Sequence, residues 1–421
     1  MELWNRNQLL KNFFSLGFLQ VATIIIQLLL VPFVIKKIGI EHFGVIAVAQ
    51  AVMYYLATLS DYGFNQSGTK EVSLNRSNNK ILSAVLSRVI YTKLFLCIVS
   101  LIILLLLSFL FEFIQQHFLL YSLGFVFVIG QAAMPSWFLQ GIEKMHWNAF
   151  AVFISKLLFA ALVLLFIKEP GDDKLYLFFM GAGSILTGIT SLFMICRNMN
   201  LSFKKISGSD IIMEIKNGWP ITATNLAMNV IQYGNLFILR LFSNDLIAGY
   251  FGIAERIFLA VKQVLVIFSQ AVYPRLCVIA ETGKEGLILF FKKVFLPFFY
   301  IILTGSFILY FLSPYIIYYF THEKNQISIF ALRMFCILLP VICLNLPGTL
   351  LMLALNRKKP YFLIYFSGMI FCIVSNIILV NTFSVNGTIA AMFLTEMLIT
   401  VAATIVLYNF WKKPGSVPLQ K

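Results

Sequence analysis

Three charged side chains lie inside an otherwise apolar stretch of the chain, Ile247 to Tyr273. Its 27 residues exceed the roughly 20 apolar residues that a helix needs to cross a bilayer. Glu255, Arg256 and Lys262 stand near its middle, where a charge costs at least about 2.5 kcal/mol on insertion scales. Charges at such positions usually face a water-filled cavity or a partner inside a helix bundle. We therefore expect a functional site on this helix.

The chemical type of the two bases indicates what they bind. Arginine presents a planar fork of donors and lysine a compact point charge, and both suit a phosphate group. Arg256 and Lys262 therefore predict a polar, mostly cationic lumen that receives an anionic ligand. The alternative interpretation is a buried ion pair that only packs the helix bundle.

Further ionisable residues lie in or beside other apolar segments. Three are basic, and each either lines the lumen or extends its charge to the membrane surface as an anchor: Lys93, Lys156 and Arg333. Three are acidic, and we assign them as candidate ion-coupling sites: Glu255, Glu396 and Asp61. Asp61 stands at a helix end, where it would alternatively serve as a cap.

Polar residues recur at helical spacing within another predicted helix. Asn225, Asn229 and Gln232 fall at i, i+4 and i+7, on one face, with Tyr233 and Asn235 close by. Amide side chains hydrogen-bond sugar hydroxyls well, so we expect this face to contact a glycan. Polar contacts between helices are the alternative interpretation.

The composition is that of a membrane protein, with 421 residues, 60% of them hydrophobic and 12% charged. The net charge is +15, but the basic residues are scattered singly between apolar runs, which argues against a nucleic-acid-binding surface.

The six cysteines form no CxxC pair and the four histidines are isolated, so we expect no disulfide, metal site or cofactor. Motifs such as Walker A, GxSxG and HExxH are missing, so we expect no enzyme.

Twelve apolar segments predict an all-α, polytopic membrane protein with twelve transmembrane helices. They cover approximately residues 13–35, 43–60, 84–111, 118–140, 149–167, 175–195, 219–241, 247–273, 289–312, 328–352, 361–380 and 387–409. We expect an N-terminal six-helix bundle over residues 1–200, a cytoplasmic linker over 201–218 and a C-terminal six-helix bundle over 219–421. Pro274 is expected to end the eighth helix.

The distribution of basic residues predicts the orientation in the membrane. If both termini are cytoplasmic, twenty-one lysines and arginines flank the segments on the cytoplasmic side and six flank them on the other side. Because cytoplasmic loops carry the excess of Lys and Arg, this asymmetry predicts that both termini are cytoplasmic.

The two halves of the chain show a faint internal similarity. The stretch GVIAVAQ at 44–50 aligns with GYFGIAE at 249–255, and six segments per half have the same loop polarity. A duplicated bundle of this kind places its ligand near the midplane between the halves, and rocking of the halves gives alternating access.

Four segments, spread over both halves, carry a resemblance to a known family. They are IGIEHFGVIAVAQA at 38–51, SDYGFNQSGTKEVS at 60–73, PSWFLQGIEKM at 135–145 and AGYFGIAERIFLAVKQVLVIFSQAVYPRL at 248–276. The chain resembles the O-antigen and polysaccharide flippases of the multidrug/oligosaccharidyl-lipid/polysaccharide exporter superfamily. None of the segments is a catalytic signature, and their combination is what marks the family.

The resemblance implies a fold and a function. The fold would be a V-shaped bundle of twelve helices, in pseudo-symmetric halves, around a central cationic cavity. The function would be to move an undecaprenyl-diphosphate-linked oligosaccharide from the cytoplasmic to the periplasmic leaflet of the bacterial inner membrane, coupled to an ion gradient. Besides this lipid-linked oligosaccharide and membrane lipids, the expected partners are a polysaccharide polymerase and a chain-length regulator.

Two other functions remain open at this point. A multidrug-cation antiporter of the same superfamily would need acidic groups in its cavity, whereas the apolar segments hold more bases than acids. A membrane-embedded polysaccharide polymerase would be expected to have a large loop outside the membrane, whereas the predicted outer loops are short.

Overall fold

The computed structural model describes residues 6–281, 284–355 and 357–412, and all regular structure in these ranges is helical. The chain divides into two compact units, which we call unit 1 (Met1–Asn229) and unit 2 (Val230–Lys421). The division falls inside the helix α9 (Gly208–Leu241). The all-α, polytopic architecture expected from the sequence is confirmed, while the domain boundaries at 200 and 218 stay a prediction.

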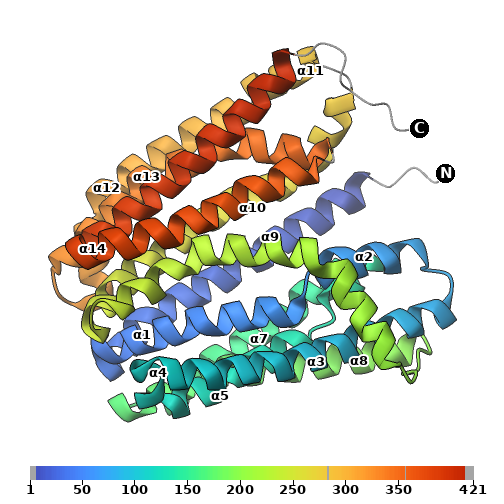
Figure 1. Cartoon of the computed structure of the whole chain (residues 1–421), viewed down its shortest axis with the longest axis horizontal. Coiled ribbons are helices and arrows are strands. Elements are labelled where there is room, and N and C mark those ends of the chain that lie inside the picture. Colours follow the sequence, from blue (N-terminus) through green and yellow to red (C-terminus); the bar gives the residue numbers. More distant parts are fainter. Residues whose placement is uncertain (1–5, 282–283, 356, 413–421) are drawn as a thin grey trace. The chain divides into compact units, whose positions relative to one another are not determined.

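Unit 1 contains long helices joined by short ones (Figure 1). Its elements are α1 (Arg6–Asp61), α2 (Phe64–Leu74), α3 (Asn79–Leu110), α4 (Glu112–Gln116), α5 (Phe118–Ala133), α6 (Ser136–Gly141), α7 (Met145–Phe166), the 3-10 turn η1 (Pro170–Asp172), α8 (Asp173–Asn198) and the first part of α9. Local signals set several ends. The Asn78 side chain accepts hydrogen bonds from the backbone N–H groups of Lys80 and Ile81 and so caps α3. Pro135 separates α5 from α6.

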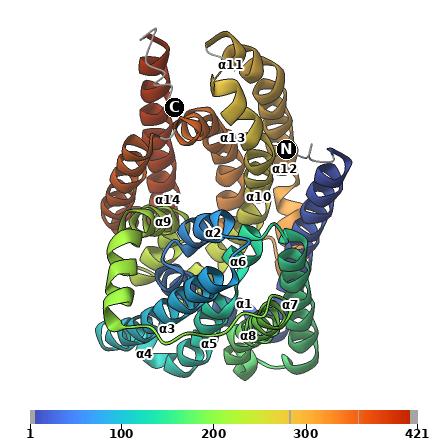
Figure 2. The same ribbon diagram turned by 90° about the vertical axis from the view of Figure 1, so that its right-hand side faces the viewer.

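Unit 2 contains the end of α9 and a second set of long helices (Figure 2). They are α10 (Asp245–Glu281), α11 (Lys284–Phe290), the π-helical turn η2 (Phe291–Phe295), α12 (Leu296–Thr321), α13 (Gln326–Ala354) and α14 (Lys358–Lys412). The helix that carries Glu255, Arg256 and Lys262 is therefore α10. The prediction that Pro274 ends this helix was wrong, because α10 continues to Glu281.

Two of the helices contain a break, and each covers two of the predicted segments. Gly39 lies within α1 with φ 84° and ψ 166°, a conformation open to glycine because it has no Cβ. Ser384 lies within α14 with φ 49° and ψ −127°. At these positions the chain turns from one membrane-length helix into the next without an intervening loop.

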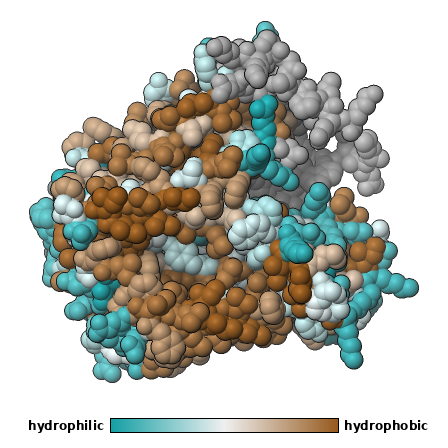
Figure 3. Space-filling view, viewed as in Figure 1, coloured by the Kyte–Doolittle hydropathy of each residue, from teal (hydrophilic) through white to brown (hydrophobic). Residues whose placement is uncertain are grey.

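Eight helical stretches in the described part of the chain are long and apolar enough to cross a membrane. On the face shown in Figure 3, apolar side chains cover the long helices of unit 1, and hydrophilic side chains gather towards the helix ends. Helices α9 and α10 are outside these eight, and both carry charged residues along their length. These helices therefore form the fold of a multi-pass membrane protein.

Candidate functional site

A polar cavity of about 390 Å³ lies inside unit 1. Six helices of this unit contribute to its wall. The lining residues are Tyr54, Ala57, Thr58 and Asp61 of α1, Asn65 of α2, Phe127 and Gln131 of α5, Ser136 of α6, Lys156 of α7, and Asn225, Met228 and Asn229 of α9. Four predicted site residues from three distant parts of the sequence are therefore brought together here: Asp61, Lys156, Asn225 and Asn229.

A fifth predicted residue, Lys93, stands directly behind the cavity wall. Its Nζ atom donates to Asp61 Oδ1 at 2.7 Å, and its side chain is only 1% exposed. Asp61 Oδ2 accepts a second hydrogen bond from Asn65 Nδ2 at 2.9 Å, and Asn65 Oδ1 accepts one from Ser136 Oγ at 3.2 Å. Lys93, Asp61, Asn65 and Ser136 thus form one connected polar chain, and Asp61 is held through both of its carboxylate oxygens.

The turn between α1 and α2 fixes the position of Asp61, the last residue of α1. Tyr62 and Gly63 both have positive φ, 47° and 72°. A Cβ added at Gly63 would lie 2.6 Å from Ile221 Cγ2, so α9 approaches this turn more closely than another residue type would allow. This close approach places the next turns of α9, with Asn225 and Asn229, at the same cavity.

The side chains in the cavity combine charge with hydrogen-bonding groups. Asn229 Nδ2 donates to the backbone oxygen of Asn225 at 3.0 Å, while Gln131 and Lys156 approach from other helices. The formal charges of Asp61, Lys93 and Lys156 sum to one positive charge. Such a cavity is suited to a hydrated, hydroxyl-rich or anionic group rather than to an apolar one.

Three other predicted residues of the second half lie in unit 2, around a much smaller cavity. Gln232, Lys262 and Glu396 line about 10 Å³, which is room for about one water molecule. Lys262 Nζ lies 5.9 Å from the centre of the Phe258 ring. Glu396 Oε2 accepts a hydrogen bond from Asn345 Nδ2 at 2.8 Å. In this unit, base and acid therefore lie beside each other in a densely packed environment.

The remaining predicted charges also lie in packed surroundings. Glu255 is 5% exposed, and the positive charges of Arg256 and Lys262 act on its carboxylate. Arg333 Nε donates to Ser313 Oγ at 3.3 Å, and its guanidinium lies 5.2 Å from the Tyr310 ring centre. Ion coupling by Glu255 and ligand binding by Arg256, Lys262 and Arg333 stay predictions.

Three asparagines of α9 show that the same helix serves both purposes that the sequence left open. Asn225 and Asn229 line the cavity, whereas Asn235 is fully buried. Asn235 Oδ1 accepts a hydrogen bond from Asn376 Nδ2 of α14 at 2.9 Å, which is a contact between helices. The amide spacing alone could not separate these two roles.

The polar cavity residues that sequence reasoning missed are Tyr54, Thr58, Asn65, Gln131 and Ser136. A signal for two of them is present. Gln131 is a polar side chain in the apolar run FVFVIGQAA, and Asn65 follows Asp61 by four residues in the sequence. Ser136 has no comparable signal, because it becomes a cavity residue only through the break that Pro135 introduces between α5 and α6. No group of three or more potential metal ligands occurs among the residues that the structure describes.

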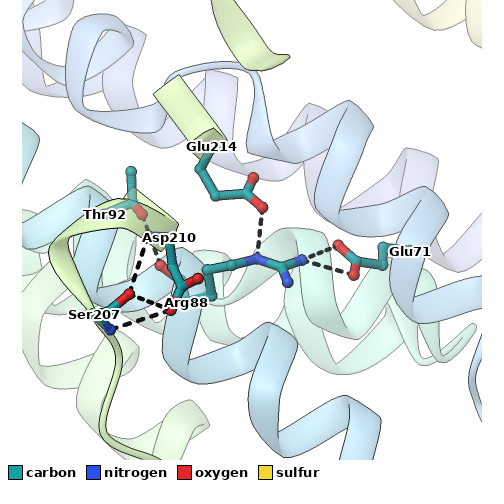
Figure 4. Close-up of polar contacts among 6 residues, drawn as sticks. All are labelled: Glu71, Arg88, Thr92, Ser207, Asp210 and Glu214. Atoms are coloured by element: carbon teal, nitrogen blue, oxygen red, sulfur yellow. Dashed lines mark hydrogen bonds and ion pairs between the residues drawn. The ribbon is translucent and has the colours of Figure 1, made fainter. Parts of the chain in front are cut away.

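An ion-pair cluster fixes the start of α9 to the same unit (Figure 4). Arg88 of α3 donates through Nη2 to both carboxylate oxygens of Glu71, at 2.7 and 2.6 Å, and its Nε lies 2.5 Å from Glu214 Oε1. Asp210 accepts hydrogen bonds from the Ser207 N–H and hydroxyl, at 3.1 and 3.0 Å. Burial raises the pKa of the Glu214 carboxyl, and the Arg88 guanidinium opposes this rise.

Comparison with known proteins adds independent information. The family model described as "Polysaccharide biosynthesis protein" matches residues 9–279. A protein of Shigella dysenteriae named "Putative O-antigen transporter" is 26% identical to the chain. The aligned region covers 63% of this chain and 67% of that protein. An Escherichia coli K12 protein of the same name is 24% identical, and the aligned region covers 69% of this chain and 70% of that protein.

Solved structures share the fold. The inward closed conformation of the lipid II flippase MurJ matches 93% of this chain and 87% of its own, with a TM-score of 0.75 and 15% identity. An inward-facing multidrug resistance MATE transporter of the MOP superfamily matches 93% of this chain and 94% of its own, with a TM-score of 0.70 and 16% identity. At these identities the likeness concerns the fold. The family match covers more than half of the sequence, and the chain therefore belongs to the polysaccharide biosynthesis protein family.

Proposed function

We propose that the protein is a flippase for a lipid-linked oligosaccharide. Its substrate would be an O-antigen repeat unit on undecaprenyl diphosphate, carried from the cytoplasmic to the periplasmic leaflet of the bacterial inner membrane. The names of the two relatives support the substrate class, since both are called O-antigen transporters. The observation that carries the proposal is the polar cavity of about 390 Å³ inside a unit of membrane-length helices.

The physical problem that such a protein solves explains the need for this cavity. A diphosphate and a glycan lose their hydrogen bonds with water when they enter hydrocarbon, and each unsatisfied polar group costs several kcal/mol. A cavity that offers lysine, asparagine and glutamine side chains replaces part of the lost hydration. In this proposal Lys156 attracts the phosphate and Asn225 and Asn229 contact the sugar. The lipid tail stays in the bilayer.

Transport of a large group also requires that the cavity open to one leaflet at a time. We propose alternating access, with coupling to an ion gradient through Asp61 and Glu396. Each of these acids has a base or an amide within hydrogen-bond distance, Lys93 for Asp61 and Asn345 for Glu396. Binding of a cation to either carboxylate would compete with that contact, which links ion binding to a local rearrangement.

A deletion strain of the bacterium that carries the gene tests the proposal. Loss of a flippase should leave single lipid-linked repeat units on the cytoplasmic face, where an impermeant glycosidase reaches them only in inverted vesicles. Loss of a polymerase would instead leave single units on the periplasmic face. Unchanged surface glycan, together with a new sensitivity to cationic drugs, would favour a multidrug antiporter and reject the proposal.

A further inference from the structure

A groove of about 280 Å³ between α7 and α8 lies apart from the polar cavity of unit 1. The two helices run next to each other (Figure 2). On α7 the groove is lined by one face of the helix, with Trp147, Phe150 and Ile154 at positions i, i+3 and i+7. These side chains are 47%, 53% and 40% exposed, so the groove opens on the outer surface of the unit.

The wall of the groove is suited to hydrocarbon. Most of its lining side chains are apolar, among them Met194 of α8. Two threonines of α8 also line it. Thr187 donates its hydroxyl to the backbone oxygen of Gly183 at 2.9 Å, and Thr190 donates to that of Leu186 at 2.8 Å. Because these hydroxyl hydrogens are already used within the helix, a polar ligand would gain little from these two threonines; the remaining polar lining residues on α8 are Ser191 and Asn198.

The length of the groove corresponds to one leaflet of a bilayer. From Lys144, which lines one end, to Ile154 there are ten helical steps, or roughly 15 Å at ~1.5 Å per residue. The hydrocarbon core of a bilayer is about 30 Å thick, so one leaflet contributes about 15 Å. An extended acyl chain with its headgroup at Lys144 would therefore follow the groove to the level of Ile154.

The charge at the Lys144 end is positive. Lys144 immediately precedes α7, and Arg197 is an exposed residue in the last turn of α8, at the same end of this antiparallel pair. The neighbouring acid, Glu143, is paired with Arg76 at 2.7 Å. The opposite end of the pair carries the acidic turn with Glu169 and Asp172. An anionic headgroup is thus favoured at the Lys144 end only, with Trp147 at the depth typical of interfacial aromatics.

From this combination we infer that the α7–α8 groove is a binding site for an acidic phospholipid of the bilayer. One acyl chain lies along Trp147, Phe150 and Ile154, and the phosphate pairs with Lys144. The site is independent of the solute that the protein carries, because none of these four residues lines the polar cavity.

Quenching of Trp147 fluorescence by brominated lipids tests this site. The full-length protein and its Trp147→Phe variant are reconstituted in phosphatidylcholine vesicles, and the difference between their emissions isolates Trp147. Increasing fractions of dibrominated phosphatidylglycerol or dibrominated phosphatidylcholine are then included. We expect half-maximal quenching at an about fivefold lower fraction of the acidic lipid, the factor that one lysine near an anionic headgroup provides.

Two charge variants and one competitor make the test specific. Lys144→Gln should remove the preference for the acidic lipid, while Lys174→Gln, at the opposite end of the helix pair, should keep it. Equal quenching by the two brominated lipids in the unmodified protein would overturn the inference. So would relief of the quenching by a small fraction of polyprenyl phosphate, because the groove would then hold the prenyl tail of a carrier lipid.

Discussion

At the scale of single residues, the pairing of Lys93 with Asp61 carries more information than either residue does alone. The sequence placed Lys93 inside an apolar segment, where it could also be a membrane-surface anchor. It placed Asp61 at a helix end, where it could also be a cap. Their contact depends on how α1 packs against α3, over 32 residues of separation, and no local spacing encodes it. By contrast, Asn225 and Asn229 share a face by helix periodicity, so their common location was predictable, although the spacing could not show that this face lines a cavity.

The Lys93–Asp61 pair should behave as a coupled unit. Lys93→Met leaves Asp61 without its cation, and Asp61→Asn leaves a lysine that is 1% exposed without its anion. Loss of one partner of a buried pair costs about 3–5 kcal/mol, whereas removal of both costs much less. The double variant should therefore be more stable in detergent than the Asp61→Asn variant. Additive losses of thermal stability in the double variant would contradict this coupling.

At the scale of elements, the sequence predicted helices better than the joints between them. Apolar runs of membrane length identified the segments, and the structure has helix at all of them within its described ranges. The break at Ser384 carries neither glycine nor proline, so the segment boundary there was visible only as a gap in hydropathy. The start of α9 lies within the predicted linker over 201–218, and there it is a helix tied to α2 and α3 through Arg88.

The Arg88 cluster predicts that the start of α9 depends on this one side chain. Arg88→Ala leaves Glu71 and the largely buried Glu214 without their common partner, a loss of about 1–3 kcal/mol per unsatisfied charged group. We expect a fall of several degrees in the apparent unfolding temperature and faster proteolysis near residues 200–215. The matched control is Arg76→Ala, which removes an exposed pair with Glu143, worth only about 0–1 kcal/mol, and one hydrogen bond to the Gly141 backbone oxygen. Equal effects of the two substitutions would argue against the cluster as the anchor of α9.

At the scale of the whole molecule, composition and charge asymmetry determine the class and the expected orientation. Sixty per cent hydrophobic residues leave few alternatives to a polytopic membrane protein. The location of the polar cavity was harder to predict, because it depends on contacts among six helices of unit 1. The sequence predicted a lumen around Arg256 and Lys262 because of their central position in one segment. The larger polar cavity is instead built around Asp61, Lys156 and the asparagines of α9.

The charge asymmetry predicts which loops face the cytoplasm. Ser77, between α2 and α3, should be cytoplasmic, and Gly171, between α7 and α8, should face the other side. Cysteines introduced at these exposed positions would report this through an impermeant maleimide. In intact cells the Gly171→Cys variant should be labelled and the Ser77→Cys variant should not, until the membrane is permeabilised. The reverse pattern would show that the orientation is inverted.

The most direct test of the central claim measures translocation of the lipid-linked repeat unit in proteoliposomes. The unmodified protein should move the glycolipid from the outer leaflet, where an impermeant glycosidase cleaves it, to the protected inner leaflet. Lys156→Gln should slow this by about tenfold or more, the loss of one charge-assisted contact, while Lys174→Gln outside the cavity should not. Translocation at the unmodified rate by a correctly folded Lys156→Gln protein would contradict the assignment of the unit 1 cavity to the substrate.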